Sequence, residues 1–481
     1  MRDGTAVWVL IHVEAEHQRG IDGSLLRPYT AACCFPLQHG GQAVLSAFDR
    51  KRILLLQGPM GPFFSRLRRD LQSAGAEVFK INLCAGDRLY YPLDAVDYRG
   101  TLEDWPAFLE QFLAHHQIDA IMLFGDCRHY HCVVPAIARA QRANLYVFEE
   151  GYLRPDYITV EEGGANSFSS LPRDPAYYRA YRPPQPEVVK AQRQPAKYGF
   201  WFAAIHAIVY ALVNFLLHWR YPHYRHHRPL NPFAEAFYWL RSGVRKLWFK
   251  VREQGFVWRL NATDGDGQRL PPFFLVPLQT HNDSQIHVHS EFASIEAFIH
   301  RVLTSFAEQA PAETCLVFKH HPLDRGYREY GRWLREVLPQ YGLQGRVFYV
   351  HDVHLPTLLD QALGTVVINS TVGLSSILHK TPVCVLGEPI YHMPGLTHQG
   401  TLEAFWNRRE PVDSALFEKF RAWLLVHNQA NGHFYRSLPA YGNCSGVAWP
   451  PSFPLPTHKP APVKLTPPIV FAPMTAKSEA A

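Results

Sequence analysis

The sequence predicts an α/β protein with two units in which buried strands alternate with helices. Short apolar runs of strand length lead into glycine-rich or polar turns, and helical spacing of apolar residues follows. This alternation occurs at 51–190 and again at 271–450, on either side of an apolar and basic stretch at 191–270. It predicts right-handed crossovers and a parallel, Rossmann-like sheet in each unit. Residues 1–50 form an irregular lead-in, and the proline-rich tail 451–481 is expected to be disordered.

The composition is that of a globular protein with about two or three domains. Hydrophobic residues make up 47% of the 481 residues and charged residues 19%, so disorder is not the main state of the chain. Lysines and arginines number 48 against 42 acids, and the net charge of +6 suits anionic substrates or an anionic membrane face. This excess is far below the dense basic patch of nucleic-acid-binding proteins, so no nucleic-acid partner is expected.

Cysteine usage and the N-terminal sequence indicate a cytoplasmic protein. The eight cysteines include no CxxC pair and lack the density of a secreted disulfide scaffold, which indicates a reducing cytosol. The apolar run at 6–11 is followed at once by acidic residues, without an evident cleavage site. We therefore expect no signal peptide.

In the first unit, the apolar runs predict four buried strands separated by three helices. The strands are expected at 53–56, 78–83, 118–124 and 145–148, and the helices at 63–74, 102–115 and 133–142. The glycine-rich turn at 57–62 lacks both GxGxxG spacing and a P-loop lysine, so it is either a tight turn or a ligand loop. A polar loop is expected at 85–88 and an extended, proline-rich linker at 172–186.

The chemistry-bearing residues of the first unit follow the ends of its strands. Glu149 and Glu150 come directly after one apolar strand, and Asp126 and Arg128 follow the preceding one. The carboxyl ends of parallel strands share one edge of the sheet, where open α/β sheets bind ligands. Neighbouring carboxylates perturb each other, so one of them can act as an acid or base near neutral pH. Paired acids at a turn are more often merely solvated, and the acids alone do not decide between these alternatives.

Residues 198–219 are dominated by apolar and aromatic side chains, and the basic cluster 220–228 follows directly. A membrane-spanning helix needs about 20 predominantly apolar residues, but His206 and Asn214 interrupt this run. A helix in the membrane interface fits the aromatic ends and the basic cluster better, and a core or inter-domain helix is the third alternative. Because the chain stays basic and aromatic to residue 252, we expect a lipid-facing insertion.

The second unit opens after a turn at 264–267 and repeats the alternation. Strands are expected at 273–278, 315–319, 347–350 and 365–368, and helices at 294–307, 330–338 and 355–361; the segment 382–387 closes the unit. The polar loop 279–285 follows the first of these strands and is of the kind that contacts ligands. Pro322 biases His321 to an extended conformation at the end of the second strand, where a protonated imidazole suits a phosphate.

A small polar turn and a helix start at 369–378 follow another buried strand of the second unit. Backbone amides and hydroxyls there can hold a phosphate against the helix N-terminus. One unit with acids and another with phosphate-binding loops indicate a cleft between facing domains, as in two-domain nucleotide-sugar glycosyltransferases. Segments 129–132 and 226–227 contain histidines and a cysteine, but such groups are more often surface or core side chains, so no metal site is expected.

Six short motifs stand out across about residues 51–430. They are 57–64 (QGPMGPFF), 80–82 (KIN), 124–128 (FGDCR), 148–155 (FEEGYLRP), 319–322 (KHHP) and 369–373 (NSTVG). In this order they resemble the bacterial capsule polysaccharide synthesis and export family, the β-Kdo glycosyltransferases. The resemblance is strongest to single-domain members that prime the lipid end of the capsule chain.

The resemblance implies a GT-B-like fold and a retaining transfer of Kdo from CMP-β-Kdo to a lysophosphatidylglycerol or other phospholipid acceptor. It further implies a cytoplasmic protein that is peripheral on the inner face of the inner membrane, with other capsule assembly or export proteins as partners. No cofactor is expected. Because a CMP-sugar carries a single phosphate, magnesium is not required to bridge two phosphates, although the sequence does not exclude it.

The same resemblance implies catalytic roles for four residues. Glu150 would be the carboxylate at the anomeric centre, with Glu149 and Asp126 as reserves, since retention requires a covalent glycosyl carboxylate or a tight ion pair. His321 would bind or protonate the departing CMP phosphate.

Further residues are expected to bind the substrates. Those that would stabilise the phosphate are Lys319, Ser370, Thr371, Ser375 and Ser376. Arg128 and Arg154 suit a bidentate contact with the sugar carboxylate. The other motif residues expected at the substrates are Gly58, Gly151, His320, Pro322, Asn369 and Gly373.

Two other functions compete with glycosyl transfer. A non-enzymatic export or scaffold protein at the membrane would explain the insertion but leave the paired acids and the His-Pro motif idle. A nucleotide-sugar epimerase of the same two-domain build would use carboxylates and a histidine but has no use for a lipid-facing helix.

Overall fold

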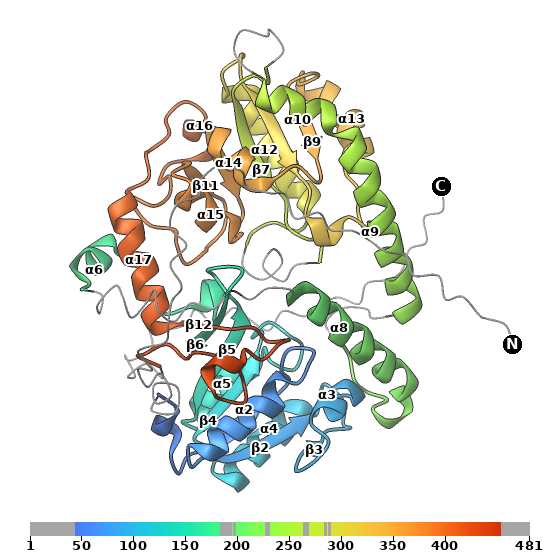
Figure 1. Cartoon of the computed structure of the whole chain (residues 1–481), viewed down its shortest axis with the longest axis vertical. Helices are drawn as coiled ribbons and strands as arrows, with labels where there is room; N and C mark the ends of the chain where they lie inside the picture. The colour runs from blue at the N-terminus through green and yellow to red at the C-terminus, as the bar shows by residue number, and fades with distance from the viewer. Residues whose placement is uncertain are drawn as a thin grey trace, which may run out of the picture. The chain divides into compact units, whose positions relative to one another are not determined.

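The computed structural model describes residues 44–182, 195, 199–226, 231–262, 269–282, 286 and 290–453 (Figure 1). Several predicted features lie wholly or partly outside these residues. They are the lead-in up to residue 43, part of the linker at 183–186, residues 227–228 of the basic cluster, the turn 264–267, part of the loop 279–285, and the tail from residue 454.

Five parallel strands form one side of the first sheet. They are β1 (Arg52–Leu55), β2 (Glu77–Asn82), β3 (Val96–Asp97), β4 (Ala120–Phe124) and β5 (Asn144–Glu150), in the order β3-β2-β1-β4-β5. This is the strand order of a Rossmann half. Ile53 and Leu55 pack into one hydrophobic cluster and Leu54 into another, so β1 is buried on both faces. The covering helices are α2 (Phe63–Ser73), α3 (Ala85–Tyr90), α4 (Trp105–His116) and α5 (Val134–Ala140).

The second sheet repeats the same order with five parallel strands. They are β7 (Phe273–Pro277), β8 (Cys315–Lys319), β9 (Val347–Val350), β10 (Gly364–Val367) and β11 (Val383–Val385), arranged β9-β8-β7-β10-β11. Its helices are α12 (Ile295–Gln309), α13 (Gly331–Val337), α14 (Leu355–Gln361), α15 (Val372–Leu378) and α16 (Leu402–Phe405). The predicted fold class, two Rossmann-like α/β units with an insertion between them in the chain, is confirmed.

The chain returns to the first sheet after the second unit. Helix α17 (Ser414–His427) leads into β12 (Gln429–Asn431), which pairs antiparallel with β6 (Tyr157–Glu162), itself antiparallel to β5. Phe434 and Trp449 then pack into the core of the first unit. The sequence predicts a second unit that extends to residue 450, whereas strand pairing and packing join 429–453 to the first (Figure 1).

Two predicted loops contain helices. Residues 85–88 belong to α3, because the Asp87 carboxylate accepts from the Leu83 amide at the helix start and Tyr210 covers the helix. The expected extended linker contains α6 (Pro175–Ala180), where the Asp174 side chain accepts from the Ala176 amide. Tyr178 is fully buried against α17, so packing overrides the proline-rich local pattern.

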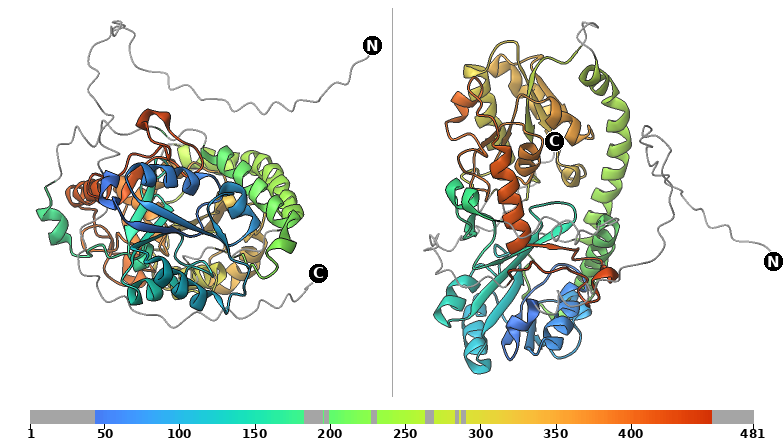
Figure 2. Two further views of the ribbon diagram at one scale, coloured as in Figure 1. Left: turned by 90° about the horizontal axis from the view of Figure 1, so that it is seen from below. Right: turned by 60° about the vertical axis from the view of Figure 1, so that its left-hand side comes forward.

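The described residues of the insertion between the two units are mainly helical. Its helices are α8 (Gly199–Leu216), α9 (Pro232–Arg252) and α10 (Gln254–Asn261), with α8 and α9 drawn in green in Figure 2. Helix α8 packs on α3, and a Cβ added at Gly86 would lie 2.5 Å from the Tyr210 ring. Within the described residues, no helix combines the length and the apolar character needed to span a bilayer.

Candidate functional site

The edge formed by the carboxyl ends of β1, β4 and β5 carries the candidate site of the first unit. Strand order reverses between β1 and β4, and ligands of open α/β sheets bind at such a switch point. Gln57 follows β1, Arg128 follows β4, and Glu149 and Glu150 end β5. The site of a Cβ on Gly125 lies 3.4 Å from Arg128 Nε and 3.7 Å from Glu149 Oε2, so the β4 and β5 ends meet as predicted.

Glu149 is the carboxyl group at this edge whose pKa is raised to near neutral pH. Burial raises its pKa to about 7, and the nearby Asp126 and Glu150 charges act in the same direction. The Glu150 amide donates to Glu149 Oε1 over 3.0 Å, and the Arg128 charge partly opposes the rise. A carboxyl group with this pKa can exchange a proton with substrate at physiological pH.

Glu150 has different neighbours from Glu149, as alternation along a strand requires. The Tyr435 hydroxyl donates to Glu150 Oε1 over 3.4 Å. Burial raises the Glu150 pKa, while the Arg154 charge and the Tyr435 hydrogen bond oppose the rise. The charges of both glutamates and of Arg128 also affect the Tyr435 pKa, so the phenol lies close to all three groups.

Arg128 is fixed at the switch point. Its Nη1 donates to Gln57 Oε1 over 3.2 Å and to the Gly58 carbonyl over 3.0 Å. The guanidinium also lies over the Phe124 ring, 4.7 Å from its centroid. A guanidinium held in this way can present its remaining donors to a carboxylate.

Asp126 is buried and accepts a hydrogen bond from a loop beside the site. Its Oδ2 accepts from the Ala165 amide over 3.0 Å, and burial raises its pKa. His131 Nδ1 lies 2.8 Å from the Gly125 carbonyl oxygen, and burial lowers the His131 pKa to about 3. These contacts support a positioning role for Asp126 at the β4 turn.

The glycines predicted at the substrates are explained by packing. A Cβ at Gly151 would meet the Tyr157 carbonyl oxygen at 2.0 Å, because β5 and β6 approach closely there. At Gly58 a Cβ would lie 2.9 Å from the Phe64 ring, and at Gly373 it would lie 2.1 Å from the Tyr391 hydroxyl. Each glycine therefore allows a close approach of neighbouring atoms, at turns for Gly58 and Gly151 and within α15 for Gly373.

The second unit presents polar side chains at its own switch point, between β7 and β10. Gln279 follows β7, and its Nε2 donates to Asn369 Oδ1 beyond β10 over 3.0 Å. His321 follows β8, and its Nδ1 accepts from the Leu323 amide over 3.2 Å. Pro322 begins the short helix after His321, while Ser370, Thr371 and Ser375 are half-buried at the β10–α15 turn.

Three residues predicted to bind the substrates lie inside the second unit. Lys319 Nζ donates to the His351 carbonyl over 2.9 Å, and burial lowers its pKa to about 8. His320 Nδ1 lies 2.6 Å from the Tyr349 hydroxyl, and burial lowers the His320 pKa to about 2. Ser376 is fully buried and donates to Thr365, so it packs the unit instead of making the predicted ligand contact.

The structure adds Tyr435, Gln57 and Gln279 to the residues expected at the two edges. The glutamines could have been found from local sequence, since each is the first polar residue after the central strand of its unit. Tyr435 had none, because only β12 brings it to the first sheet. In the part of the chain that the structure describes, no three His, Cys, Asp or Glu side chains gather as a metal site.

Sequence comparisons agree on one family. The profile of the family "Capsule polysaccharide biosynthesis protein" matches residues 119–435. The chain is 41% identical to the capsule polysaccharide modification protein LipB of Neisseria meningitidis serogroup B, over 81% of this chain and 92% of LipB. It is 40% identical to the capsule polysaccharide export protein KpsS of Escherichia coli, over 82% of this chain and 100% of KpsS.

A more distant likeness extends to a solved structure. The β-Kdo 2,7 transferase KpsC of Thermosulfurimonas dismutans is 16% identical, and the match covers 73% of this chain and 91% of that one. The TM-score of this match is 0.35.

Proposed function

The chain belongs to the capsule polysaccharide biosynthesis protein family, and from this premise we propose that it is a retaining glycosyltransferase. Its proposed donor is CMP-β-Kdo and its proposed acceptor is a lysophosphatidylglycerol-type phospholipid in capsule biosynthesis and export. The observation that carries this proposal is the pair Glu149 and Glu150 at the switch-point edge, where Glu149 has a pKa of about 7. The resemblance of the surrounding motifs to β-Kdo transferases supports the choice of sugar.

The first step of the proposed reaction uses Glu150 as the nucleophile. A Glu150 oxygen forms a bond to the anomeric carbon, and the bond from that carbon to the CMP phosphate oxygen breaks with its electron pair leaving on CMP. Arg154 and Tyr435 favour the ionised Glu150 that this attack requires. Arg128 and Arg154 are proposed to bind the carboxylate of the sugar.

The second step restores the nucleophile and gives net retention. The acceptor hydroxyl oxygen attacks the anomeric carbon, the bond to Glu150 breaks, and the hydroxyl proton passes to Glu149. A base with a pKa near 7 suits this transfer, and the different surroundings of the two glutamates fit their separate tasks. Each step inverts the anomeric centre, so two steps retain its configuration.

The second unit is proposed to hold CMP. His321, Ser370, Thr371 and Ser375 lie at or beside the ends of β8 and β10, where loops of a Rossmann-like unit receive a nucleotide. His321 would bind or protonate the departing phosphate. A CMP-sugar carries a single phosphate, so this chemistry needs no metal that bridges two phosphates, and no cofactor is proposed.

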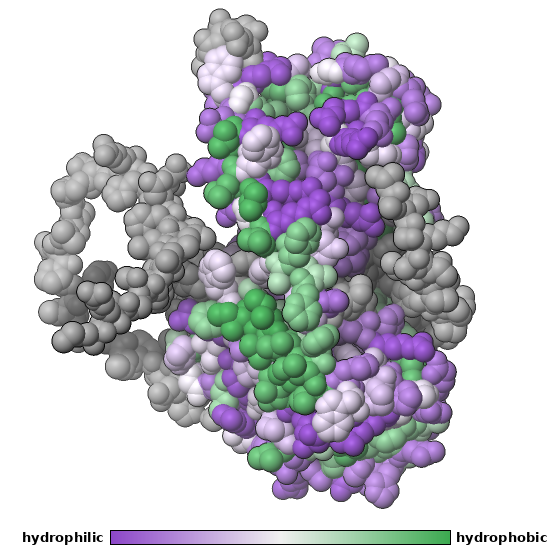
Figure 3. Space-filling view, turned by 90° about the vertical axis from the view of Figure 1, so that its right-hand side faces the viewer, coloured by the Kyte–Doolittle hydropathy of each residue, from purple (hydrophilic) through white to green (hydrophobic). Residues whose placement is uncertain are grey.

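The insertion is proposed to bind the inner face of the inner membrane. Helix α9 leaves one apolar stripe exposed at helical spacing, formed by Phe233, Phe237, Leu240, Val244, Leu247, Trp248 and Val251. Helix α8 and η4 (His218–Arg220) continue it with Trp201, Ile205, Ile208, Phe215, Leu216 and Trp219. Figure 3 shows hydrophobic side chains gathered on the face that carries these helices. Exposed Lys246, Lys250 and Arg252 beside the stripe suit anionic lipid.

A transfer assay with purified protein tests the proposed function. CMP-Kdo and lysophosphatidylglycerol micelles are expected to give a Kdo-lipid product and one CMP for each sugar transferred. A scaffold or export protein would give neither, and an epimerase would alter a nucleotide sugar without an acceptor. Product absent at every acceptor concentration would reject the proposed function. Other capsule assembly proteins are the proposed partners at the membrane, and the same assay can include them.

A further inference from the structure

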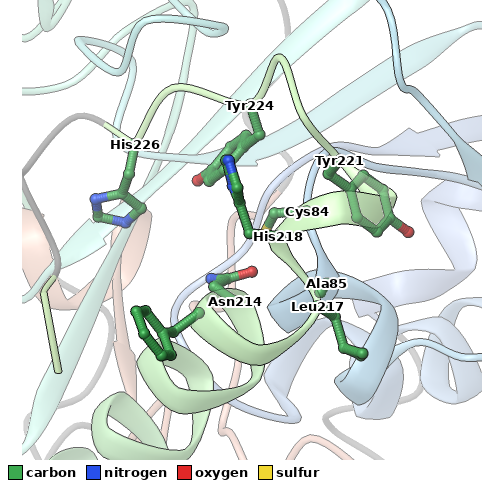
Figure 4. A pocket seen from close by; sticks show the side chains of 9 residues that line it. Cys84, Ala85, Asn214, Leu217, His218, Tyr221, Tyr224 and His226 are labelled. Carbon is green, nitrogen blue, oxygen red and sulfur yellow. The ribbon is translucent and has the colours of Figure 1, made fainter.

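A pocket of about 300 Å³ lies between α3 and the chain that follows α8 (Figure 4). Cys84 and Ala85 form one wall, and Asn214, His218, Tyr221 and Tyr224 are among the residues of the other. The volume is at the lower end of the range for small-molecule sites. Nothing in the proposed transfer steps uses this pocket.

Two side chains of the pocket wall have hydrogen-bond donors to which the described residues supply no acceptor. Asn214 Oδ1 accepts from the Gly86 amide over 2.8 Å, whereas its buried Nδ2 has no hydrogen-bond partner among the described residues. The Tyr224 hydroxyl accepts from Gln57 Nε2 over 2.9 Å, which leaves its own hydrogen to be donated. A buried donor without a partner is costly, so these groups favour a ligand rich in oxygen atoms.

The charge around the pocket favours an anion. Two acids lie near it, Asp87 and Asp97. The Leu83 amide, the Tyr210 hydroxyl and Gln57 Nε2 all donate to the Asp87 carboxylate, and Arg88 Nη1 donates to that of Asp97. The exposed His218 side chain lines the pocket, and Arg220 follows in the same turn. The polar wall of the pocket therefore combines hydrogen-bond donors with nearby basic side chains.

One side chain connects the pocket to the candidate site. Gln57 donates to Tyr224 in the pocket wall and accepts from Arg128 Nη1 on its other side. Arg128 in turn influences the pKa of Glu149, the proposed base. Gln57 and Arg128 thus connect a ligand in this pocket to the reaction centre.

The pocket also borders the exposed apolar face of α8. Phe215 lines it and is 50% exposed, and Leu216 and Trp219 continue the apolar surface at 59% and 73%. A polar pocket beside such a surface matches a molecule with a polar head and an apolar chain. We propose that the pocket binds the hydroxylated, anionic headgroup of the acceptor lipid, whose acyl chain lies along α8. This inference rests on the proposed function and assigns its acceptor site.

The test compares acceptor and donor kinetics in Asn214→Asp and Tyr224→Phe. Asn214→Asp keeps the acceptor for the Gly86 amide but replaces the unused donor with a carboxylate. We expect its KM for lysophosphatidylglycerol to rise about tenfold or more, and that of Tyr224→Phe several-fold. The KM for CMP-Kdo should stay unchanged, and circular dichroism should show that both variants are folded. His223→Ala is the matched control, since this exposed side chain belongs to the same segment but does not line the pocket.

Unchanged acceptor KM values in both folded variants would overturn the inference while leaving the proposed function intact. If wild-type protein transfers no sugar, calorimetry with water-soluble glycerophosphoglycerol and with lysophosphatidylglycerol still tests the pocket. We expect both to bind, the lipid more tightly, and Asn214→Asp to weaken both about tenfold. Binding of neither, or equal binding by Asn214→Asp, would overturn the inference independently of catalysis.

Discussion

Tyr435 donates a hydrogen bond to Glu150 across 285 positions of the chain, with the phenol oxygen 3.4 Å from Glu150 Oε1. Strand β12 makes this contact possible, because it returns the chain to the first sheet after the second unit. The contact opposes the rise in the Glu150 pKa that burial causes. The C-terminal segment therefore takes part in the electrostatics of the candidate site.

Removing this hydroxyl tests the role of the contact. Tyr435→Phe takes away a hydrogen bond to ionised Glu150, so the pKa of Glu150 should rise further. We expect kcat to fall about three- to tenfold and the acidic limb of the kcat/KM profile to move to higher pH. Tyr177→Phe, at an exposed tyrosine of α6, is the control. An unchanged pH profile of kcat/KM in Tyr435→Phe would show that Tyr435 has no role in catalysis.

The pKa of Glu149 predicts a second feature of the pH profile. A base must be deprotonated, so activity should rise with pH through about 7. Glu149→Gln should remove this limb and lower kcat about 100-fold or more. A Glu149→Gln profile that still rises through pH 7 would assign the base to another group.

Glu149 should also make the stability of the fold depend on pH. Stability should fall as pH rises, whereas activity should increase. The pKa of this carboxyl is near its ordinary value of 4.5 in the unfolded chain and about 7 in the folded protein. As pH rises between these values, the unfolded state ionises first, so Glu149 makes the fold less stable across this window. Thermal denaturation should show Glu149→Gln more stable than wild type at pH 8 and equal to it at pH 4. A lower melting temperature of the variant at pH 8 would contradict this sign.

Glu253 is expected to be a structural link between the insertion and the second unit. Its carboxylate accepts from the His351 amide over 2.6 Å and the Asp352 amide over 2.9 Å, and Phe249 stacks on the His351 ring. Glu253→Ala would leave these donors unsatisfied and should lower the free energy of unfolding by about 2–4 kcal/mol. Denaturant unfolding measures this, with the exposed Glu308→Ala as control. An equal loss of unfolding free energy in Glu253→Ala and Glu308→Ala would contradict a structural role for Glu253.

The apolar stripe of α9 predicts membrane binding. Replacing Leu240, Leu247 and Trp248 by serine should strongly reduce flotation with vesicles that contain anionic lipid, because these side chains are 70%, 70% and 61% exposed. The matched control replaces Leu93, Leu323 and Leu378, which are exposed outside the insertion. Equal flotation of both triple variants would contradict the interface proposal.

Elements and site residues can be predicted from the sequence where the local pattern and the tertiary structure agree. Buried parallel strands carry continuous apolar runs, so β1, β4 and β8 are recognisable, and with them the residues that follow their ends. Asp126, Arg128 and Glu149 can therefore be assigned to one edge of the sheet from the amino-acid pattern alone.

Local sequence does not predict an element or a side-chain position where contacts with residues distant in the chain determine it. Helix α3 depends on Tyr210, whose ring covers Gly86, and α6 depends on burial of Tyr178 against α17. The short strand β12 has no apolar run of its own, so Tyr435 cannot be placed from local pattern. Ser376 resembles a ligand residue in its motif, but its side chain faces Thr365 inside the unit.

The central claim is that a Glu150 oxygen attacks the anomeric carbon. Peptide mass spectrometry after incubation with CMP-Kdo and without acceptor tests it most directly. We predict a Kdo ester on the peptide that contains Glu150 in wild-type protein, and neither ester nor lipid product in Glu150→Gln. Undiminished transfer by Glu150→Gln, or a Kdo ester on another residue, would contradict this account.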